Sequence, residues 1–238
     1  MILLQEPFLS DTHDCPYLES RKCRYEYFFA LDVTGEELCR LLEQGWRKFG
    51  AYFFRPNCPG CGKCIPLRVL TREFSKSKSQ RRIARGGEVL TFQVGPLRYS
   101  QRAFEIYRDH SLNRFGKEAD MQEFIMNFYT QSCPTLQSEY YLGDKLIAVG
   151  FLDRGENSLS SVYFVFDTQY DYLRPGTFSV ISEIDYARSQ GLDYYYLGYW
   201  IRENASMSYK NAFYPHERYD WASMQWGRIE KGDDKKFL

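Results

Sequence analysis

The stretch QSEYYLGDKLIAVGFL, from Gln137 to Leu152, shows most directly how this chain folds. Two strand-like runs flank Gly143-Asp144, a pair that favours the type I′ or II′ turn of a two-residue β-hairpin. A third run of the same kind follows at Leu159–Phe166. The stretch therefore predicts an antiparallel meander of three strands.

Farther along the chain, a loop at Leu173-Arg174-Pro175-Gly176 is expected to lead into a helix that begins near Thr177 and ends at Gly191. Its apolar residues recur at helical spacing: Phe178, Ile181, Ile184 and Ala187. A further strand is expected at Asp193–Leu197, and the charged run Glu230–Lys236 is expected to be frayed.

Two helices are predicted before the hairpin. Ser100 is expected to cap the first, and Asp120 with Glu123 forms a capping box that opens the second. The resulting order of helix, helix, hairpin, strand, helix and strand resembles the core of GNAT-type N-acyltransferases. The expected fold class is α/β (α+β mixed), with a GNAT-like acyltransferase core and a mixed, largely antiparallel sheet.

The amino-terminal half shows a different pattern. A strand is predicted at Arg24–Leu31, and Thr34 with Glu37 forms a capping box for the helix that follows. Tyr52-Phe53-Phe54 and Ile65–Leu70 are predicted strands on either side of a cysteine-rich turn. Gly95-Pro96 is the candidate boundary, which predicts a Cys-rich domain at 1–96 and an acyltransferase-like domain at 97–238.

The cysteine-rich turn carries a C-x-x-C-x-x-C spacing at Cys58, Cys61 and Cys64. Pro59, Gly60 and Gly62 bend the backbone between them, so several sulfur atoms can converge on one zinc ion or iron–sulfur cluster. The preferred fourth ligand is Cys15, followed by Cys23 and His13. The alternative is a turn with reduced, unliganded thiols.

Composition bounds the remaining possibilities. Thirty-one basic and 31 acidic residues give a net charge of zero, and aromatic residues reach 18%. Tyrosine-rich chains often bind flat ligands, although a tyrosine-rich core is the commoner reason. No segment is apolar enough to span a membrane, and seven clustered cysteines fit reduced thiols. A soluble, cytoplasmic protein is therefore expected.

Basic residues gather locally between positions 71 and 85, interleaved with Ser75, Ser77, Ser79 and Gln80. They are Arg72, Lys76, Lys78, Arg81, Arg82 and Arg85. Such a run, poor in helix formers, is expected to contact phosphate or carboxylate oxygens. A solvated loop is the alternative.

Other candidate ligand-binding residues lie in the second half. The helix start at Arg174-Pro175-Gly176 is expected to bind an anion, or else to be an ordinary capped helix. Gly198 suggests a bulge or a close approach to a ligand. Lys210 is expected either to clamp a phosphate or carboxylate or to lie on the surface, and Asp167 either to accept a proton or to cap a turn.

Several reaction classes lack their motifs. The chain has three histidines without zinc-site spacing, and no nucleophile elbow, P-loop or dinucleotide fingerprint. Aminoacyl transfer, by contrast, starts from an activated ester and depends mainly on positioning, which removes roughly 7–11 kcal/mol of barrier.

The motifs together resemble the arginyl-tRNA–protein transferase family, in particular its bacterial branch that transfers leucine. The matching segments cover about Cys15 to Pro215. They are Cys15-Pro16-Tyr17-Leu18, Gly45–Gly50, Tyr52–Cys61, Ser77–Arg82, Leu159–Tyr163, Phe166-Asp167, Gly176-Thr177-Phe178, Tyr196–Ile201 and Met207–Lys210. Thr168, the run Leu18-Glu19-Ser20 and the extra Cys23 depart from the pattern.

The resemblance implies transfer of leucine from leucyl-tRNA to the amino terminus of proteins that begin with Asp or Glu, which marks them for degradation by the N-degron (N-end rule) pathway. The reaction that it implies requires no cofactor. It also implies a zinc ion or iron–sulfur cluster on Cys15, Cys58, Cys61 and Cys64. The rival functions are arginyl transfer, acetyl-coenzyme A-dependent N-acetylation and a zinc-ribbon adaptor for nucleic acid.

With these substrates, each candidate residue has an expected role. Arg81 or Arg82 would grip the acceptor carboxylate, and Asp167, together with Tyr199, would act in catalysis. The tRNA would be bound by Lys78, Arg174, Gly176, Trp200, Tyr209 and Lys210, with the terminal adenosine stacked on Tyr199 or Trp200.

Overall fold

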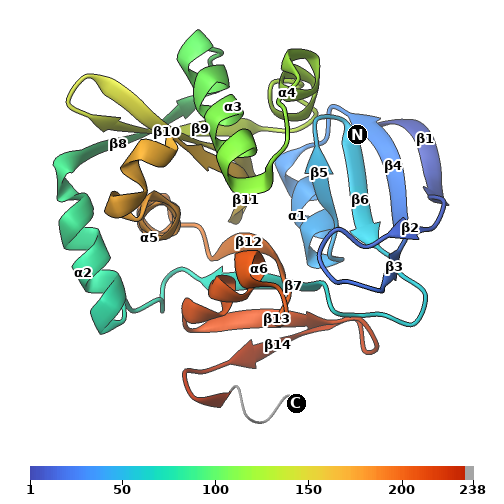
Figure 1. Ribbon diagram of the computed structural model, residues 1–238. Coiled ribbons are helices and arrows are strands. Elements are labelled where there is room, and N and C mark those ends of the chain that lie inside the picture. The colour runs from blue at the N-terminus through green and yellow to red at the C-terminus, as the bar shows by residue number, and fades with distance from the viewer. Residues whose placement is uncertain (234–238) are drawn as a thin grey trace.

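A large mixed sheet forms the centre of the computed structural model, which describes residues 1–233 (Figure 1). The charged run Glu230–Lys236 is expected to be frayed, and its residues 234–236 lie outside the described residues. Eight strands run in the order β14-β13-β7-β12-β11-β10-β9-β8. They are β7 (Ile65–Leu70), β8 (Leu90–Pro96), β9 (Thr135–Leu142), β10 (Lys145–Arg154), β11 (Ser158–Phe166), β12 (Tyr194–Trp200), β13 (His216–Asp220) and β14 (Gln225–Ile229).

The predicted fold class is confirmed in its coarser form, a mixed α/β fold with a mostly antiparallel sheet. Every neighbouring pair in the large sheet is antiparallel except β11 and β12. The hairpin turn is also confirmed, because Lys145 pairs with Leu142 across Gly143-Asp144. Gly143 has a φ of 57°, the positive value that primed turns require.

Helices cover both faces of this sheet (Figure 1). On one face, α3 (Gln101–Phe115) and α4 (Met121–Phe128) pack an aromatic layer against Val149 and Phe151 of β10. On the other, α5 (Pro175–Ser189) buries Val180, Ile181 and Ile184 against β10–β12. The short helices are η2 (Thr168–Leu173), α6 (Ala205–Ser208) and η3 (Tyr209–Ala212).

A smaller four-stranded sheet holds the amino-terminal residues, in the order β1-β4-β6-β5. Its strands are β1 (Ile2–Leu9), β4 (Tyr25–Leu31), β5 (Arg47–Phe49) and β6 (Tyr52–Pro56), and β2 (His13–Asp14) pairs with β3 (Lys22–Cys23) beside it. Helix α1 (Gly35–Glu43) starts at the predicted capping box of Thr34 and Glu37. Its buried leucines pack with Phe28, Phe53 and Tyr196 of β12, which joins the two sheets through one core.

The cysteine loop connects the two sheets. It leaves β6 at Pro56 and enters β7 at Ile65, so the prediction that it joins two strands is confirmed. Strand β7 then lies between β12 and β13, and β8 forms the opposite edge of the same sheet. Residues on both sides of the predicted boundary at residue 96 therefore share one sheet, and the two-domain division stays a prediction.

The basic run is helical from Lys78 onward, contrary to the expectation drawn from its serines. It forms α2 (Lys78–Gly86), followed by η1 (Gly87–Val89). Ser77 accepts a hydrogen bond from the backbone N–H of Gln80, and the Gln80 side chain accepts one from the N–H of Ser77. The two residues expected to contact phosphate thus cap the helix. Within residues 1–233, no helix is long and apolar enough to cross a membrane.

Candidate active site

The two parallel strands of the large sheet diverge, and a cationic site lies where they separate. Strands β11 and β12 pair only from Ser158–Tyr194 to Ser160–Tyr196, although both continue beyond these residues. Just past this point, the register of β12 against β7 shifts between Tyr196 and Gly198. Gly198 has a φ of 85°, so the predicted bulge is confirmed.

Arg47 reaches the point of divergence from β5. Its Nη1 donates to the hydroxyl of Ser160 at 2.7 Å, and its Nη2 donates to the backbone carbonyl of Ser161. Burial lowers the pKa of its guanidinium, because the charged form has lost much of its water. Sequence reasoning missed this residue. The available signal was its place in the matching run Gly45–Gly50, next to a second cation, Lys48.

Lys210 approaches the same point from η3, and its ammonium donates to the backbone carbonyl of Tyr199 at 3.0 Å. A Cβ atom built on Gly198 would lie 3.4 Å from Nζ of Lys210 and 3.7 Å from Nη2 of Arg47. The two cations therefore lie over a residue that has no side chain. We refer to Arg47, Lys210 and Gly198 as the cation pair site.

The cation pair site has an uncompensated positive charge. Desolvation and the neighbouring guanidinium of Arg47 lower the pKa of Lys210 to about 7. Within residues 1–233, neither Arg47 nor Lys210 forms an ion pair with a carboxylate. The nearby acid Asp153 is already bound to Lys48 at 3.1 Å, with both side chains buried. Such a site favours an anionic ligand.

The structure gives Tyr199 and Trp200 buried positions next to this site. The Tyr199 hydroxyl donates to the carbonyl of Gly45 at 2.9 Å, and burial raises its pKa well above the usual value. The Trp200 indole donates to the carbonyl of Ser208, and the Arg218 guanidinium lies 4.0 Å from the ring centre. Both side chains thus have structural contacts, and their predicted catalytic and stacking roles stay predictions.

Asp167 takes the structural alternative that the sequence leaves open. It caps η2 by accepting a hydrogen bond from the N–H of Gln169 at 3.2 Å. Its other carboxylate oxygen pairs with Arg102 and lies 3.8 Å from Lys145. These contacts hold the carboxylate in a structural role, and its catalytic role stays a prediction.

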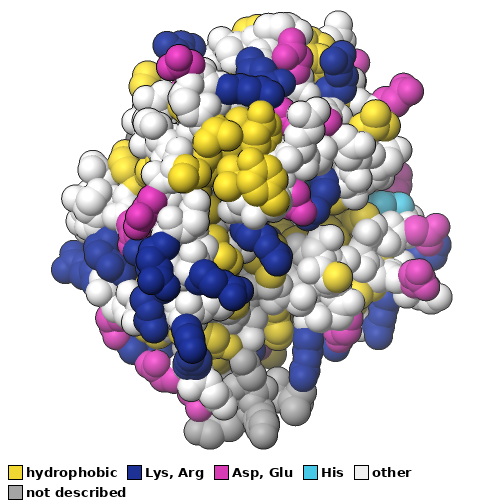
Figure 2. All heavy atoms as spheres, turned by 60° about the vertical axis from the view of Figure 1, so that its left-hand side comes forward, with side chains coloured by type: hydrophobic (Ala, Val, Ile, Leu, Met, Phe, Trp, Pro, Cys, Tyr) yellow, Lys and Arg dark blue, Asp and Glu magenta, His cyan; other side chains and the backbone are white. Residues whose placement is uncertain are grey.

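The other predicted substrate-binding residues lie on exposed surfaces. Lys78, Arg81 and Arg82 are exposed on α2, and Arg81 also donates to the carbonyl of Lys76 at 2.7 Å. Figure 2, which brings the α2 side of the molecule forward, shows Lys and Arg side chains gathered on the lower half of this face.

The start of α5 is also accessible. Arg174 is exposed with a φ of 56°, and the helix has no side-chain cap there. A Cβ atom on Gly176 would meet no atom within 4 Å. Tyr209 is likewise exposed, next to Lys210. The structure therefore brings Lys210 to the cation pair site, with Tyr209 next to it in the chain, whereas the residues of α2 lie on a separate element.

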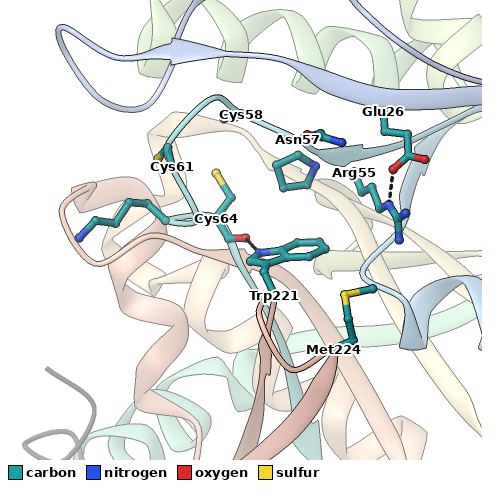
Figure 3. Close-up of a pocket in the computed structure, with 11 residues that line it drawn as sticks. Glu26, Arg55, Asn57, Cys58, Cys61, Cys64, Trp221 and Met224 are labelled. Carbon is teal, nitrogen blue, oxygen red and sulfur yellow. Dashed lines mark hydrogen bonds and ion pairs between the residues drawn. The ribbon is translucent and has the colours of Figure 1, made fainter.

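The cysteine loop borders a cavity of about 290 Å³ (Figure 3). Trp221 closes one side and donates to the carbonyl of Cys64 at 3.0 Å, and the Glu26–Arg55 ion pair lies on another. Burial and neighbouring thiols raise the pKa of Cys64 to about 12.

The donor set does not have the arrangement of a metal site. Within residues 1–233, no group of three or more His, Cys, Asp or Glu side chains is placed to hold a metal ion. The predicted ligands Cys15, Cys58, Cys61 and Cys64 all carry free thiols in the structure. The thiols of Cys15, Cys58 and Cys61 lie close enough to Cys64 to raise its pKa, and their role as metal ligands stays a prediction. No step of the chemistry is assigned to a metal.

Comparison with known proteins identifies similar chains. The family model described as "Arginine-tRNA-protein transferase, N terminus" matches residues 13–82, and "Arginine-tRNA-protein transferase, C terminus" matches residues 102–220. The aspartate/glutamate leucyltransferase of Helicobacter hepaticus is 31% identical over 217 residues, covering 88% of this chain and 90% of that protein. The enzyme of the same name from Campylobacter jejuni is 31% identical over 224 residues, covering 90% and 93%.

Among solved structures, L-PGS from Bacillus licheniformis matches with a TM-score of 0.45 and 14% sequence identity. That match covers 77% of this chain and 55% of the other. At this level of similarity, it carries no inference about function.

Proposed function

Because the chain belongs to the arginine-tRNA-protein transferase family, we propose that it transfers leucine from leucyl-tRNA to the amino terminus of proteins that begin with Asp or Glu. The observation that carries this proposal is the similarity to proteins named aspartate/glutamate leucyltransferase across about nine tenths of both chains. The uncompensated cations of the cation pair site support an acidic substrate.

In the reaction, the neutral α-amine of the acceptor attacks the carbonyl carbon of the leucyl ester. A C–N bond forms, the ester C–O bond breaks, and the ribose hydroxyl of the terminal adenosine leaves. The amine gives up one proton and the leaving oxygen takes one, so no redox partner or nucleotide hydrolysis is required. The ester is already activated, so the main task of the protein is to hold the amine against it.

We assign the fold of the second half to the GNAT-like acyltransferases. The support is the divergence of β11 and β12 beyond Ser160, with α5 connecting the two strands. A gap between diverging strands can receive an extended acyl ester, because backbone groups there have no partner strand. The exposed start of α5 at Arg174 and Gly176 faces the solvent, where phosphates of the tRNA end would be accessible.

The aminoacyl-tRNA substrate also suggests where the reaction takes place. Aminoacyl-tRNA is made and used in the cytoplasm, so we place the protein there. The acceptors are expected to be proteins that expose Asp or Glu after processing, and their leucylation would mark them for degradation.

The test is to incubate the pure protein with an Asp-initiated peptide and, in separate reactions, leucyl-tRNA, phenylalanyl-tRNA, arginyl-tRNA or acetyl-coenzyme A. Mass spectrometry should show one leucine added to the Asp-initiated peptide and far less leucine added to its Asn-initiated counterpart. An arginine adduct would overturn the proposed donor, and an acetyl adduct would overturn the proposed reaction class.

A further inference from the structure

We propose that Arg47 and Lys210 form the subsite that binds the side-chain carboxylate of the acceptor's first residue, and that this subsite discriminates Asp and Glu from Asn and Gln. The inference rests on the proposed function and names the residues that would set its acceptor specificity. It gives this pair the role that the sequence suggested for Arg81 or Arg82. Those two arginines are exposed on α2 and form no enclosed site.

Unused hydrogen-bond donors support this assignment. Arg47 has five N–H groups, and its contacts to Ser160 and Ser161 employ both terminal nitrogens without using all of them. Lys210 has three N–H groups, of which one points to the carbonyl of Tyr199. The remaining donors are enough for the two oxygens of one carboxylate.

Fixed positions support it as well. The short strand β5 and the contacts to β11 hold the guanidinium of Arg47 in place. Lys210 reaches the same place on a flexible stem from a different element, η3. A rigid cation and an adjustable one can together accommodate both Asp and Glu, whose carboxylates differ in reach by one methylene group.

The backbone at Gly198 carries no side chain on the side of the two cations. Any side chain there would project toward both cations, at 3.4 Å from Lys210 and 3.7 Å from Arg47. The positive φ of Gly198 also makes other residues unfavourable at this position. No side chain of residue 198 therefore stands between the backbone and the two cations.

The location of the pair also suits the reaction. In an Asp residue, only two carbon atoms separate the carboxylate carbon from the α-amine nitrogen, so binding the carboxylate places the amine near the diverging ends of β11 and β12. An Asn or Gln side chain has an amide N–H₂ group in place of one carboxylate oxygen, and this group cannot accept a hydrogen bond from either cation.

The test compares Lys210→Met with wild type, and with Lys117→Met as the control. Methionine keeps much of the length of the lysine stem and removes its charge, whereas Lys117 is exposed and forms no ion pair within residues 1–233. Transfer of leucine to Asp-, Glu- and Asn-initiated peptides is measured at saturating leucyl-tRNA. Binding of leucyl-tRNA and of fluorescent Asp- and Asn-initiated peptides is measured separately.

For Lys210→Met we expect kcat/KM to fall at least about 30-fold for Asp- and Glu-initiated peptides, the decrease typical when one partner of a buried charge pair is removed. Residual transfer to the Asn-initiated peptide and the Kd for leucyl-tRNA should stay within about twofold of wild type. The thermal midpoint should stay within a few degrees of wild type. Arg47→Gln should show the same selectivity, and Lys210→Arg should recover much of the missing activity.

Other outcomes contradict the proposal. Equal decreases for Asp- and Asn-initiated peptides with weaker leucyl-tRNA binding would show that the pair binds a tRNA phosphate. Unchanged kinetics in a folded Lys210→Met variant would show that the pair binds no substrate. If wild type transfers no leucine, the proposed function fails, yet preferential binding of the Asp-initiated peptide that disappears in Lys210→Met would still support the subsite.

Discussion

Glu183 on α5 is a buried carboxyl group that the proposed chemistry does not use. It is 1% exposed and accepts hydrogen bonds from the hydroxyls of Ser138, Tyr140 and Tyr195 at 2.9, 3.2 and 2.5 Å. Burial raises its pKa to about 7, although the three hydrogen bonds act in the opposite direction. A buried carboxyl with this pKa binds a proton more tightly in the folded state than in the unfolded one.

Stability should therefore depend on pH through Glu183. Between its ordinary pKa near 4.5 and the folded value near 7, the folded state holds more protons, so the free energy of unfolding falls as the pH rises. The total fall is on the order of 3 kcal/mol. In Glu183→Gln, we expect most of this fall between pH 5 and 8 to disappear.

Urea denaturation at several pH values measures this effect. Glu118→Gln is the matched control, because Glu118 is exposed on the loop before α4. A Glu183→Gln variant that keeps the full pH dependence of wild type would show that another group is responsible.

Single residues also show where sequence reasoning succeeds. The hairpin glycine Gly143 and the bulge glycine Gly198 can both be identified from the sequence, because only a few residue types adopt a positive φ without strain. Arg47 cannot be identified in this way. Its importance depends on contacts with Ser160 and Ser161, more than 110 residues away, and no local pattern records such a contact.

At the scale of elements, the packing of α2 on α5 depends on Gly87. A Cβ atom at this position would lie 2.2 Å from the ring of Phe178, which is far inside van der Waals contact. The backbone of Gly87 is right-handed helical, with φ −83° and ψ −6°, a conformation that alanine adopts without strain. The glycine is thus required by packing rather than by its own conformation.

Gly87→Ala should lower the free energy of unfolding by about 1–3 kcal/mol, because the methyl group forces Phe178 to move. The neighbouring Gly86→Ala is the control, since it has a helical backbone and no atom within 4 Å of the added Cβ. That variant should be neutral or gain up to about 1 kcal/mol. Equal effects of the two substitutions in chemical denaturation would contradict the role of Phe178.

The same helix shows where a sequence-based expectation is wrong. The serine-rich run is expected to be poor in helix formers, whereas Ser77 and Gln80 form a capping box that opens a helix. The predicted contacts of this run with phosphate or carboxylate oxygens stay a prediction. The capping pattern S-x-x-Q is present in the sequence and favours a helix. The low helix propensity of serine argues against a helix and accounts for the wrong expectation. Burial of Gln80 against the carbonyl of Ala212 supplies the missing stability from a distant segment.

For the whole molecule, positive charge is localised even though the net charge is zero. The exposed cations of α2 lie on one face (Figure 2) and would attract a tRNA backbone. Leucyl-tRNA binding should therefore weaken as salt rises. The double variant Lys78→Ala/Arg82→Ala should reduce the slope of log K against log salt concentration by roughly 1.5, because each phosphate that is no longer neutralised removes about 0.7–0.9 from it.

Filter binding at four salt concentrations measures that slope, with Lys117→Ala as the control. A double variant with the wild-type slope would show that α2 does not contact the tRNA. Transfer to an Asp-initiated peptide at saturating leucyl-tRNA should change little, which separates this surface from the cation pair site.

The overall architecture is predictable only in part. The meander and the β11–α5–β12 unit follow from local periodicity, and so does the capped helix α1. The position of β7 between β12 and β13 does not, because strand order depends on contacts between segments 124 to 151 residues apart.

The position of β7 has a consequence for synthesis on the ribosome. Residues 65–70 emerge early, but both of their neighbours, residues 194–200 and 216–220, are translated in the last fifth of the chain. A nascent polypeptide that stops short of them exposes an unpaired, largely apolar strand and also lacks Lys210. Prematurely released fragments would consequently be inactive and prone to aggregation, so the enzyme gains activity only once its synthesis is nearly complete.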